Sequence, residues 1–152
     1  MPTRSKPRVF VDADVIFAGS ASPSEHSASL VTLRMGEITL IDAVTSRQAI
    51  TEAERNLSAK LPHALTTFRL LVERSLRVVP NPSGRDLAAH KDIADPKDLP
   101  ILVAAVRECC RWLVTFNVDD FEPGHPDVTV LRPGAFIQRV RSVLTHLDLT
   151  RE

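Results

Sequence analysis

The chain has 152 residues, 43% of them hydrophobic, and its 19 basic and 19 acidic residues give a net charge of zero. This length fits one domain with an ordinary core, so we predict a single domain over residues 1–152, with residues 1–7 as a loose tail. The balanced charge excludes a bulk attraction to nucleic acid but not a local basic face, and the lack of a long apolar run excludes a membrane span and predicts a cytoplasmic protein.

Short apolar runs alternate with helical patterns along the whole chain. The first strand is predicted over Arg8–Asp12, where three apolar residues are followed by a carboxylate. Further strands are predicted over residues 38–41, 77–80, 112–115 and 128–131. Because short strands that alternate with helices typically form a parallel sheet, the pattern predicts an α/β fold.

The helices between these strands are predicted from their caps and their apolar spacing. The first runs from a cap at Ser24 to about Met35, with Gly36 as its stop. Residues 45–48 match a capping box that opens a helix to about residue 61, with Thr45 at the N-cap. Further helices are predicted from Pro62, over residues 85–93, over residues 101–106, and from Pro133 to about Leu147.

Acidic or amide side chains recur at four places, three of them at predicted strand ends or helix starts. They are Asp12 with Asp14, Glu52 with Glu54, Asp95 with Asp98, and Asn117 with Asp119 and Asp120. Two carboxylates about 4 Å apart repel by about 4 kcal/mol at an effective dielectric constant of about 20, so converging carboxylates need protons or cations. Since hard divalent cations prefer oxygen ligands, the set predicts a site for Mg²⁺ or Mn²⁺, whereas the scattered histidines predict no zinc site.

Each of these residues also has a structural interpretation. Asp12 and Asp14 suit a cap on a following helix, and Asp98 stands where an ordinary N-cap would precede the helix over residues 101–106. Glu52 and Glu54 suit the solvent-facing side of a helix, and periodicity does not decide which of the two faces the other acids. The presence of all four places in one α/β chain favours a functional cluster.

The four motifs, in this order and spacing, resemble those of the PIN domain family of metal-dependent nucleases. V-D-A-D-V-I-F-A-G is similar to the family's hydrophobic–Asp–Thr–Asn start, with its first acid at Asp12. E-A-E-R-N-L resembles the family's glutamate-containing helix and places the second acid at Glu52. D-P-K-D before I-L-V-A-A-V resembles the third motif, with its acid at Asp98, and L-V-T-F-N-V-D-D-F resembles the fourth. The resemblance covers residues 9–133.

The chain departs from the family's pattern in two of these motifs. Ala13 and Asp14 replace the common Thr and Asn, and Asn117 stands where many members carry the fourth acid. An amide oxygen can bind a metal but brings no charge, so either Asp119 or Asp120 compensates or a second metal binds weakly. Both of these acids are also ordinary turn residues.

The resemblance implies a three-layer α/β/α fold, in which helices flank a central parallel sheet and the acids lie at its carboxyl edge. It also implies a hydrolase that cleaves RNA with the help of Mg²⁺ or Mn²⁺. The implied catalytic residues are Asp12, Glu52, Asp98, Asn117 and Asp120, of which the first four are the implied metal ligands. Many bacterial members are dimeric toxins inhibited by a small antitoxin, which implies a homodimer and an antitoxin partner here.

The residues leave two other functions open. In a haloacid-dehalogenase-like phosphatase, Asp12 would be the nucleophile and Asp14 the general acid, although Ile16 and Phe17 follow where that family usually has Gly or Val and then Thr. A PIN-like module without catalysis would bind RNA or a partner, and Asn117 favours it. Candidate contacts to RNA phosphates are Arg47, Arg55, Lys60, Lys91 and Lys97.

Overall fold

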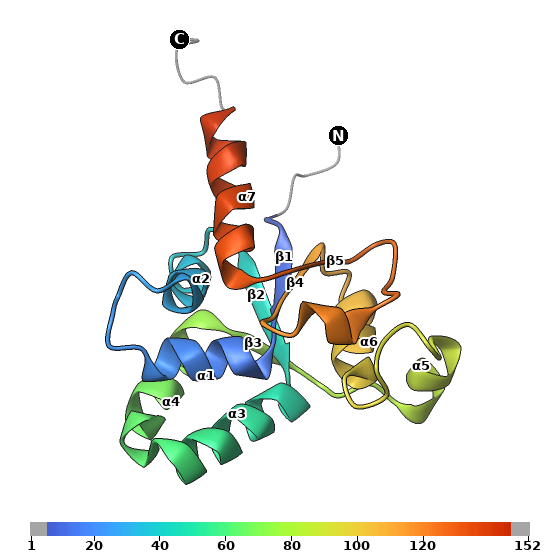
Figure 1. Ribbon diagram of the computed structural model, residues 1–152, viewed down its shortest axis with the longest axis horizontal. Helices are drawn as coiled ribbons and strands as arrows, with labels where there is room; N and C mark the ends of the chain where they lie inside the picture. The colour runs from blue at the N-terminus through green and yellow to red at the C-terminus, as the bar shows by residue number, and fades with distance from the viewer. Residues whose placement is uncertain (1–5, 147–152) are drawn as a thin grey trace.

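In the computed structural model, which describes residues 6–146, five short strands form one parallel sheet. Their order is β3-β2-β1-β4-β5, so the first strand lies in the middle (Figure 1). The strands are β1 (Arg8–Val11), β2 (Asp42–Ser46), β3 (Arg77–Val79), β4 (Trp112–Val114) and β5 (Thr129–Leu131). The predicted parallel α/β sheet is therefore confirmed.

Helices cover both faces of this sheet, which confirms the predicted three layers (Figure 1). The α-helices are α1 (Ala13–Ala21), α2 (Ala28–Glu37), α3 (Arg47–Lys60), α4 (Leu65–Ser75), α5 (Gly84–Ala89), α6 (Leu99–Arg107) and α7 (Pro133–Thr145). Two short 3₁₀ helices are η1 (Pro62–Ala64) and η2 (Val118–Phe121). Helices α1 to α4 contact one another on one side, where α7 packs on α2, and α5 contacts α6 on the other.

The core is built around the central strand. Val9, Phe10 and Val11 of β1 are fully buried, because β1 pairs with β2 and β4 and is covered by helices on both faces. Residues 101–105 of α6 are also buried, which explains why this helix is apolar on every side. Within residues 6–146, no helix combines the length and the apolar character needed to cross a membrane. Most of the predicted tail and Leu147 of the predicted terminal helix lie outside the described residues.

The helix before β2 differs from its prediction at both ends. Ser27, not Ser24, caps α2, and its hydroxyl accepts a hydrogen bond from the Leu30 N–H at 3.2 Å. The helix continues through Gly36 to Glu37. Gly36 is therefore not a stop signal, and its lack of a side chain has a packing reason instead.

The second strand begins later than predicted. Ile38 and Leu40, which the prediction placed in the strand, are 67% and 43% exposed, and β2 starts only at Asp42. The prediction chose residues 38–41 because they are more apolar than the segment that follows. The true strand β2, D-A-V-T-S, is not strongly apolar. Pairing with β1 on one side and β3 on the other buries this strand despite its composition.

The capping box also works differently from the prediction. Ser46 rather than Thr45 caps α3, and its hydroxyl accepts a hydrogen bond from the Ala49 N–H at 3.2 Å. The Thr45 hydroxyl instead donates to the Val11 carbonyl at 2.8 Å and so ties β2 to β1. Helix α1, which only the capping interpretation of Asp12 and Asp14 anticipated, begins directly after Asp12.

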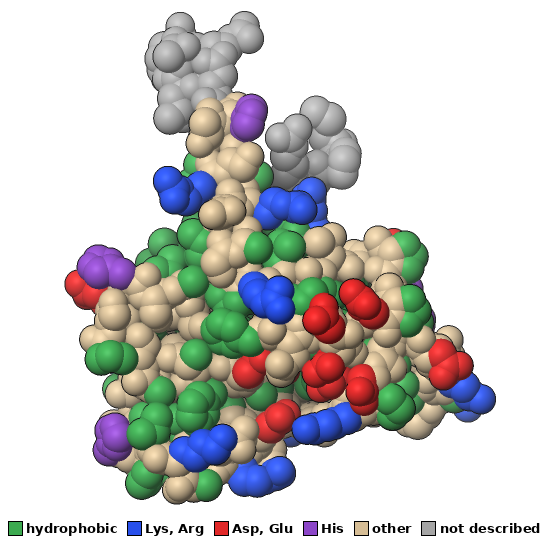
Figure 2. Space-filling model, viewed as in Figure 1, with side chains coloured by type: hydrophobic (Ala, Val, Ile, Leu, Met, Phe, Trp, Pro, Cys, Tyr) green, Lys and Arg blue, Asp and Glu red, His purple; other side chains and the backbone are tan. Residues whose placement is uncertain are grey.

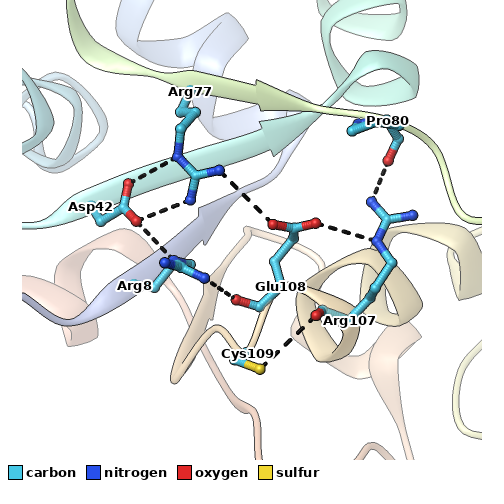
Figure 3. Close-up of polar contacts among 7 residues, drawn as sticks. All are labelled: Arg8, Asp42, Arg77, Pro80, Arg107, Glu108 and Cys109. Atoms are coloured by element: carbon cyan, nitrogen blue, oxygen red, sulfur yellow. Dashed lines mark hydrogen bonds and ion pairs between the residues drawn. The ribbon is translucent and has the colours of Figure 1, made fainter. Parts of the chain in front are cut away.

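Ion pairs join the strands at the amino edge of the sheet (Figure 3). Asp42 accepts hydrogen bonds from Arg8 at 2.8 Å and from Arg77 at 3.0 Å. Glu108, just after α6, pairs with Arg107 at 3.3 Å and lies 3.9 Å from Arg77. Partial burial acts to raise the pKa of Asp42, but the hydrogen bonds from Arg77 and Arg8 lower it below its ordinary value. Asp42 is thus held in its charged form, and both Asp42 and Glu108 have arginine partners at this edge.

Candidate active site

The strand order of the sheet reverses between β1 and β4, and this point of the carboxyl edge is where a ligand is expected. The chain proceeds from β1 outward to β2 and β3, and then returns to add β4 and β5 on the other side. In open α/β sheets, ligands bind outside the carboxyl ends of the strands where the strand order reverses in this way. Asp12 follows β1 and Thr115 follows β4 at this point, and the Asp12 N–H donates to the Val114 carbonyl at 3.0 Å.

Asp12 is a buried carboxylate with both oxygens held in place. It is 7% exposed; its Oδ1 accepts from the Ala13 N–H at 2.7 Å and its Oδ2 from the Thr115 hydroxyl at 2.9 Å. Burial raises the pKa of Asp12 to about 7, with further contributions from the negative charges of Asp14 and Glu52. The residue therefore does cap α1, as its structural interpretation predicted, and it also lies at the crevice.

Asp14 lies beside Asp12 and joins it to the segment after β4. Its Oδ2 accepts hydrogen bonds from the Phe116 N–H at 3.0 Å and from the Asn117 side-chain amide at 3.2 Å, with the Thr115 hydroxyl at 3.3 Å. Its Oδ1 is buried and has no hydrogen-bond partner within the described residues. Burial raises the pKa of Asp14 as well. A buried oxygen without a donor is a position that a cation would satisfy.

Thr115 is a site residue that the sequence reasoning missed. It is fully buried, and its hydroxyl bridges the two neighbouring carboxylates, Asp12 and Asp14. The same oxygen accepts a hydrogen bond from the Asn117 N–H at 3.1 Å. The signal that could have found it was its place at the end of the predicted strand over residues 112–115, one strand away from Asp12.

Glu52, and not Glu54, faces the other acids. Glu52 is half-buried on α3, and its charge contributes to the raised pKa values of both Asp12 and Asp98. Glu54 is exposed and lines a separate hollow on α3 with Arg55 and Ser58. The tertiary structure thus decides the choice that periodicity left open.

Asp98 lies at the start of α6, where its side chain is free of the helix cap. Asp98 occupies the predicted N-cap position and its carbonyl accepts from the Leu102 N–H at 3.3 Å, but its side chain makes no cap hydrogen bond. Burial raises the pKa of Asp98, and the charges of Asp120, Asp95 and Glu52 raise it further. Asp120 lies on η2, and its carbonyl accepts a hydrogen bond from the Asp95 N–H at 2.9 Å, which ties the two acidic loops together.

A groove of about 600 Å³ contains two of these acids and two of the candidate phosphate contacts. Its lining includes Glu52 and Asp98 together with Arg55 and Lys97. The other three candidate phosphate contacts, Arg47, Lys60 and Lys91, do not line this groove. The Lys60 ammonium lies 6.0 Å from the centre of the Phe17 ring. Basic side chains therefore flank the acids at the groove without cancelling their charge.

The acids of the carboxyl edge are unpaired, in contrast to those of the amino edge. Figure 2 shows acidic side chains gathered on one face of the molecule, with Lys and Arg at their border. Within residues 6–146, no basic side chain comes within 4.0 Å of the carboxylates of Asp12, Asp14, Glu52, Asp98 and Asp120. In the same part of the chain, no three His, Cys, Asp or Glu side chains form a metal site as they stand. The oxygen donors of this edge are nevertheless of the kind that a hard cation prefers.

A model of the PIN domain matches residues 8–119, which is most of the chain. This chain belongs to the PIN domain family. The match to the PIN domain overturns the phosphatase interpretation of Asp12 and Asp14. No curated protein sequence matches this PIN domain significantly.

Three solved structures share the fold of this PIN domain. VapBC2 from Rickettsia felis, solved bound to a DNA fragment from its promoter, is 14% identical with a TM-score of 0.63, and the match covers 81% of this chain and 96% of that one. PAE2754 from Pyrobaculum aerophilum is 14% identical with a TM-score of 0.62, over 90% and 96% of the two chains. VapC20 from Mycobacterium tuberculosis, a toxin that cleaves the sarcin-ricin loop, is 15% identical with a TM-score of 0.55, over 79% and 98%.

Proposed function

We propose that this PIN domain is a metal-dependent endoribonuclease that hydrolyses phosphodiester bonds of RNA. The observation that carries the proposal is the set of unpaired carboxylates at the β1–β4 crevice, among which the pKa values of Asp12, Asp14 and Asp98 are raised. Such repulsion is relieved by protons or by a cation, and Mg²⁺ and Mn²⁺ are the cations that oxygen donors prefer. Membership of a family of nucleases supports the same reaction.

We assign the metal ligands from the side chains that face the crevice. Asp12, Glu52 and Asp98 are the main ligands, and the Asn117 amide oxygen completes the set. The Asn117 side-chain nitrogen donates to Asp14, so its oxygen is the atom left for the metal. The bound ion would supply a Lewis acid that activates water and stabilises charge on the phosphate.

In this proposal, the remaining polar residues orient a metal ligand and the attacking water, and they bind the RNA phosphates. The Thr115 hydroxyl and the Ala13 N–H fix the two oxygens of Asp12, so this ligand is preorganised. Arg55 and Lys97, which share the groove with Glu52 and Asp98, bind the RNA phosphates on either side of the scissile bond. Asp120 orients the water, because its charge lies close to that of Asp98.

A cleavage assay with Mn²⁺ and single-stranded RNA tests this function. We expect Asp12→Asn and Glu52→Gln each to lower the cleavage rate about a hundredfold or more. Glu54→Gln is the matched control, since Glu54 is on the same helix but points away from the acids, and it should keep the wild-type rate. Equal residual cleavage in the wild type and all variants would reveal a contaminant and refute the proposal.

We further propose that the protein is the toxin of a toxin–antitoxin pair and forms a homodimer. The support for the toxin role is the shared fold with VapC20, which is named as a toxin, and with VapBC2, while the homodimer is what the resemblance to the family implies. A small protein encoded beside this chain should co-purify with it and suppress its RNA cleavage. Mass measurement of the free protein should give twice 16.8 kDa. Failure to find a co-purifying neighbour would remove the toxin role but not the nuclease activity.

The second candidate is a PIN domain that binds RNA or a partner without cleaving. Asn117 favours this candidate, because an amide stands where a charged fourth acid would strengthen metal binding. Wild-type protein that binds RNA but shows no Mn²⁺-dependent cleavage would support it. In that case Asn117→Asp should create or strengthen the cleavage.

A further inference from the structure

An apolar hollow lies beside the segment after β4 that is hydrogen-bonded to Asp14, and it shares no lining residue with the groove that contains Glu52. Its volume is about 630 Å³, and it is formed by the end of α1, the start of α2, the start of α7 and the residue after Thr115. Most of its lining is small or apolar: Ala18, Ala21, Ala28, Phe116, Pro133 and Ala135. Figure 2 shows hydrophobic side chains beside the acidic ones on the same face.

Phe116 is the feature that connects this hollow to the acids. It is 42% exposed, whereas Phe10, Phe68, Phe121 and Phe136 are buried. Its backbone N–H donates to the Asp14 carboxylate at 3.0 Å, so the Phe116 backbone is held directly beside the crevice. A single exposed hydrophobic side chain is normal on a protein surface, but an exposed aromatic ring beside a proposed RNA cleavage site has a specific use.

The charge of the hollow also matches a nucleotide. Arg132 is exposed on its rim, and none of the lining residues carries a carboxylate. No ion pair occupies Arg132 within the described residues. An unpaired base presents a flat apolar face, and the phosphate next to it presents a negative charge, which are the two properties that Phe116 and Arg132 complement.

We infer that this hollow is a subsite for an unpaired base of the RNA, with the Phe116 ring as the stacking surface and Arg132 as the contact to the adjacent phosphate. The inference rests on the proposed function for the nature of the ligand. It adds that the preferred substrate is single-stranded next to the cleaved bond, because a base in a duplex cannot enter the hollow.

The binding experiment uses a short single-stranded oligoribonucleotide in a buffer without divalent cations, so that no cleavage occurs. Phe116→Ala should weaken the affinity about 5- to 100-fold, the range that base–aromatic stacking gives, and Phe116→Trp should keep it. Leu70→Ala is the matched control: Leu70 is 44% exposed on α4, and its loss should not change the affinity. Arg132→Gln should reduce the salt dependence of binding by about one phosphate contact, and it leaves the cap of α7 intact because the Arg132 side chain makes no cap hydrogen bond.

An abasic nucleotide identifies the base that stacks. At one position of the oligonucleotide, removing the base should weaken binding to the wild type but cause no further loss with Phe116→Ala. Unchanged affinity of Phe116→Ala, with cleavage by the wild type intact, would overturn the subsite and leave the nuclease function standing. Phe116-dependent binding without any cleavage would support the subsite and overturn the nuclease function. A Phe116→Ala variant that binds RNA normally but loses a co-purifying partner protein would also overturn the subsite.

Discussion

The environment of Asp12 makes this single residue a source of instability in the metal-free protein. An ordinary aspartate pKa is near 3.8, and burial, together with Asp14 and Glu52, raises that of Asp12 to about 7. The folded state therefore binds the Asp12 proton more tightly than the unfolded state does. The resulting stability is fully present below pH 4 and is lost as the pH rises through 7. The loss amounts to about 4 kcal/mol at most, since one pKa unit corresponds to about 1.4 kcal/mol.

Asp12→Asn should accordingly raise the melting temperature of the metal-free protein at pH 8, with a smaller effect at pH 5. The Asn oxygen can still accept from the Ala13 N–H, and the Thr115 hydroxyl can accept from the new amide instead of donating. Thermal unfolding in EDTA measures the difference. Asp42→Asn is the control, and it should lower the melting temperature at pH 8 because Asp42 is paired with Arg8 and Arg77. If Asp12→Asn melts at a lower temperature than the wild type at pH 8, the charged carboxylate of Asp12 does not destabilise the fold.

Asp98 provides a separate test, because stability and activity should respond differently to its change. Its side chain makes no cap hydrogen bond and lies close to other negative charges, so Asp98→Asn should not lower the free energy of unfolding and should raise it slightly at pH 8. The same variant should lose Mn²⁺-dependent cleavage. Ser46→Ala, which removes the side-chain cap of α3, should cost about 1 kcal/mol instead. Urea denaturation measures both variants, and a loss of about 1 kcal/mol for Asp98→Asn would restore the structural interpretation.

Helix α2 shows how packing between elements overrides a local signal. A glycine inside a helix normally costs about 1 kcal/mol relative to alanine. A Cβ on Gly36, however, would collide with the Ser75 carbonyl at the end of α4 and lie 2.9 Å from the Ala43 side chain. The close approach of α2, α4 and β2 therefore requires glycine at this position.

Gly36→Ala should thus destabilise the protein by about 1–3 kcal/mol, the usual cost of overpacking, despite the better helix propensity of alanine. Gly134 in α7 is the matched control, because nothing lies within 4 Å of a Cβ built there. Gly134→Ala should be neutral or stabilising by up to about 1 kcal/mol. Chemical denaturation of the two variants gives the comparison, and equal stabilisation by both would contradict the close packing around Gly36.

The whole molecule has two unlike edges. At the amino edge, Asp42 and Glu108 are paired with arginines (Figure 3). At the carboxyl edge, the acids that follow β1, lie on α3 and η2 and precede α6 are left without basic partners among the described residues. Both edges are needed for the proposed function, since the first stabilises the sheet and the second keeps its charge available for a cation.

Divalent metal should therefore stabilise the whole protein in a pH-dependent way. A ligand at about a hundred times its dissociation constant stabilises the folded state by about 2.7 kcal/mol. Protons compete for the same carboxylates, so Mn²⁺ should raise the melting temperature more at pH 8 than at pH 5. Thermal unfolding with and without Mn²⁺ at both pH values tests this. An equal rise for the wild type and Asp12→Asn would place the ion elsewhere.

The sequence by itself determined the local features of this protein. The apolar run before Asp12, the buried helix over residues 101–106 and the strand before Thr115 each follow from neighbouring residues, so their alternation predicted the parallel sheet. The order and spacing of the motifs predicted the PIN domain family, which the family match confirms. The catalytic and metal-binding roles of Asp12, Glu52, Asp98, Asn117 and Asp120 stay predictions.

Only the tertiary structure decided which residues meet. It chose Glu52 over Glu54, showed that the Asp98 side chain caps nothing, and joined Asp14 to Thr115 across two strands. It also showed that the second strand begins at Asp42. The sequence of this strand, β2, is not strongly apolar, but the neighbouring strands β1 and β3 bury it. Periodicity records which side of an element is apolar, whereas burial and contact depend on segments far apart in the chain, and no local pattern contains that information.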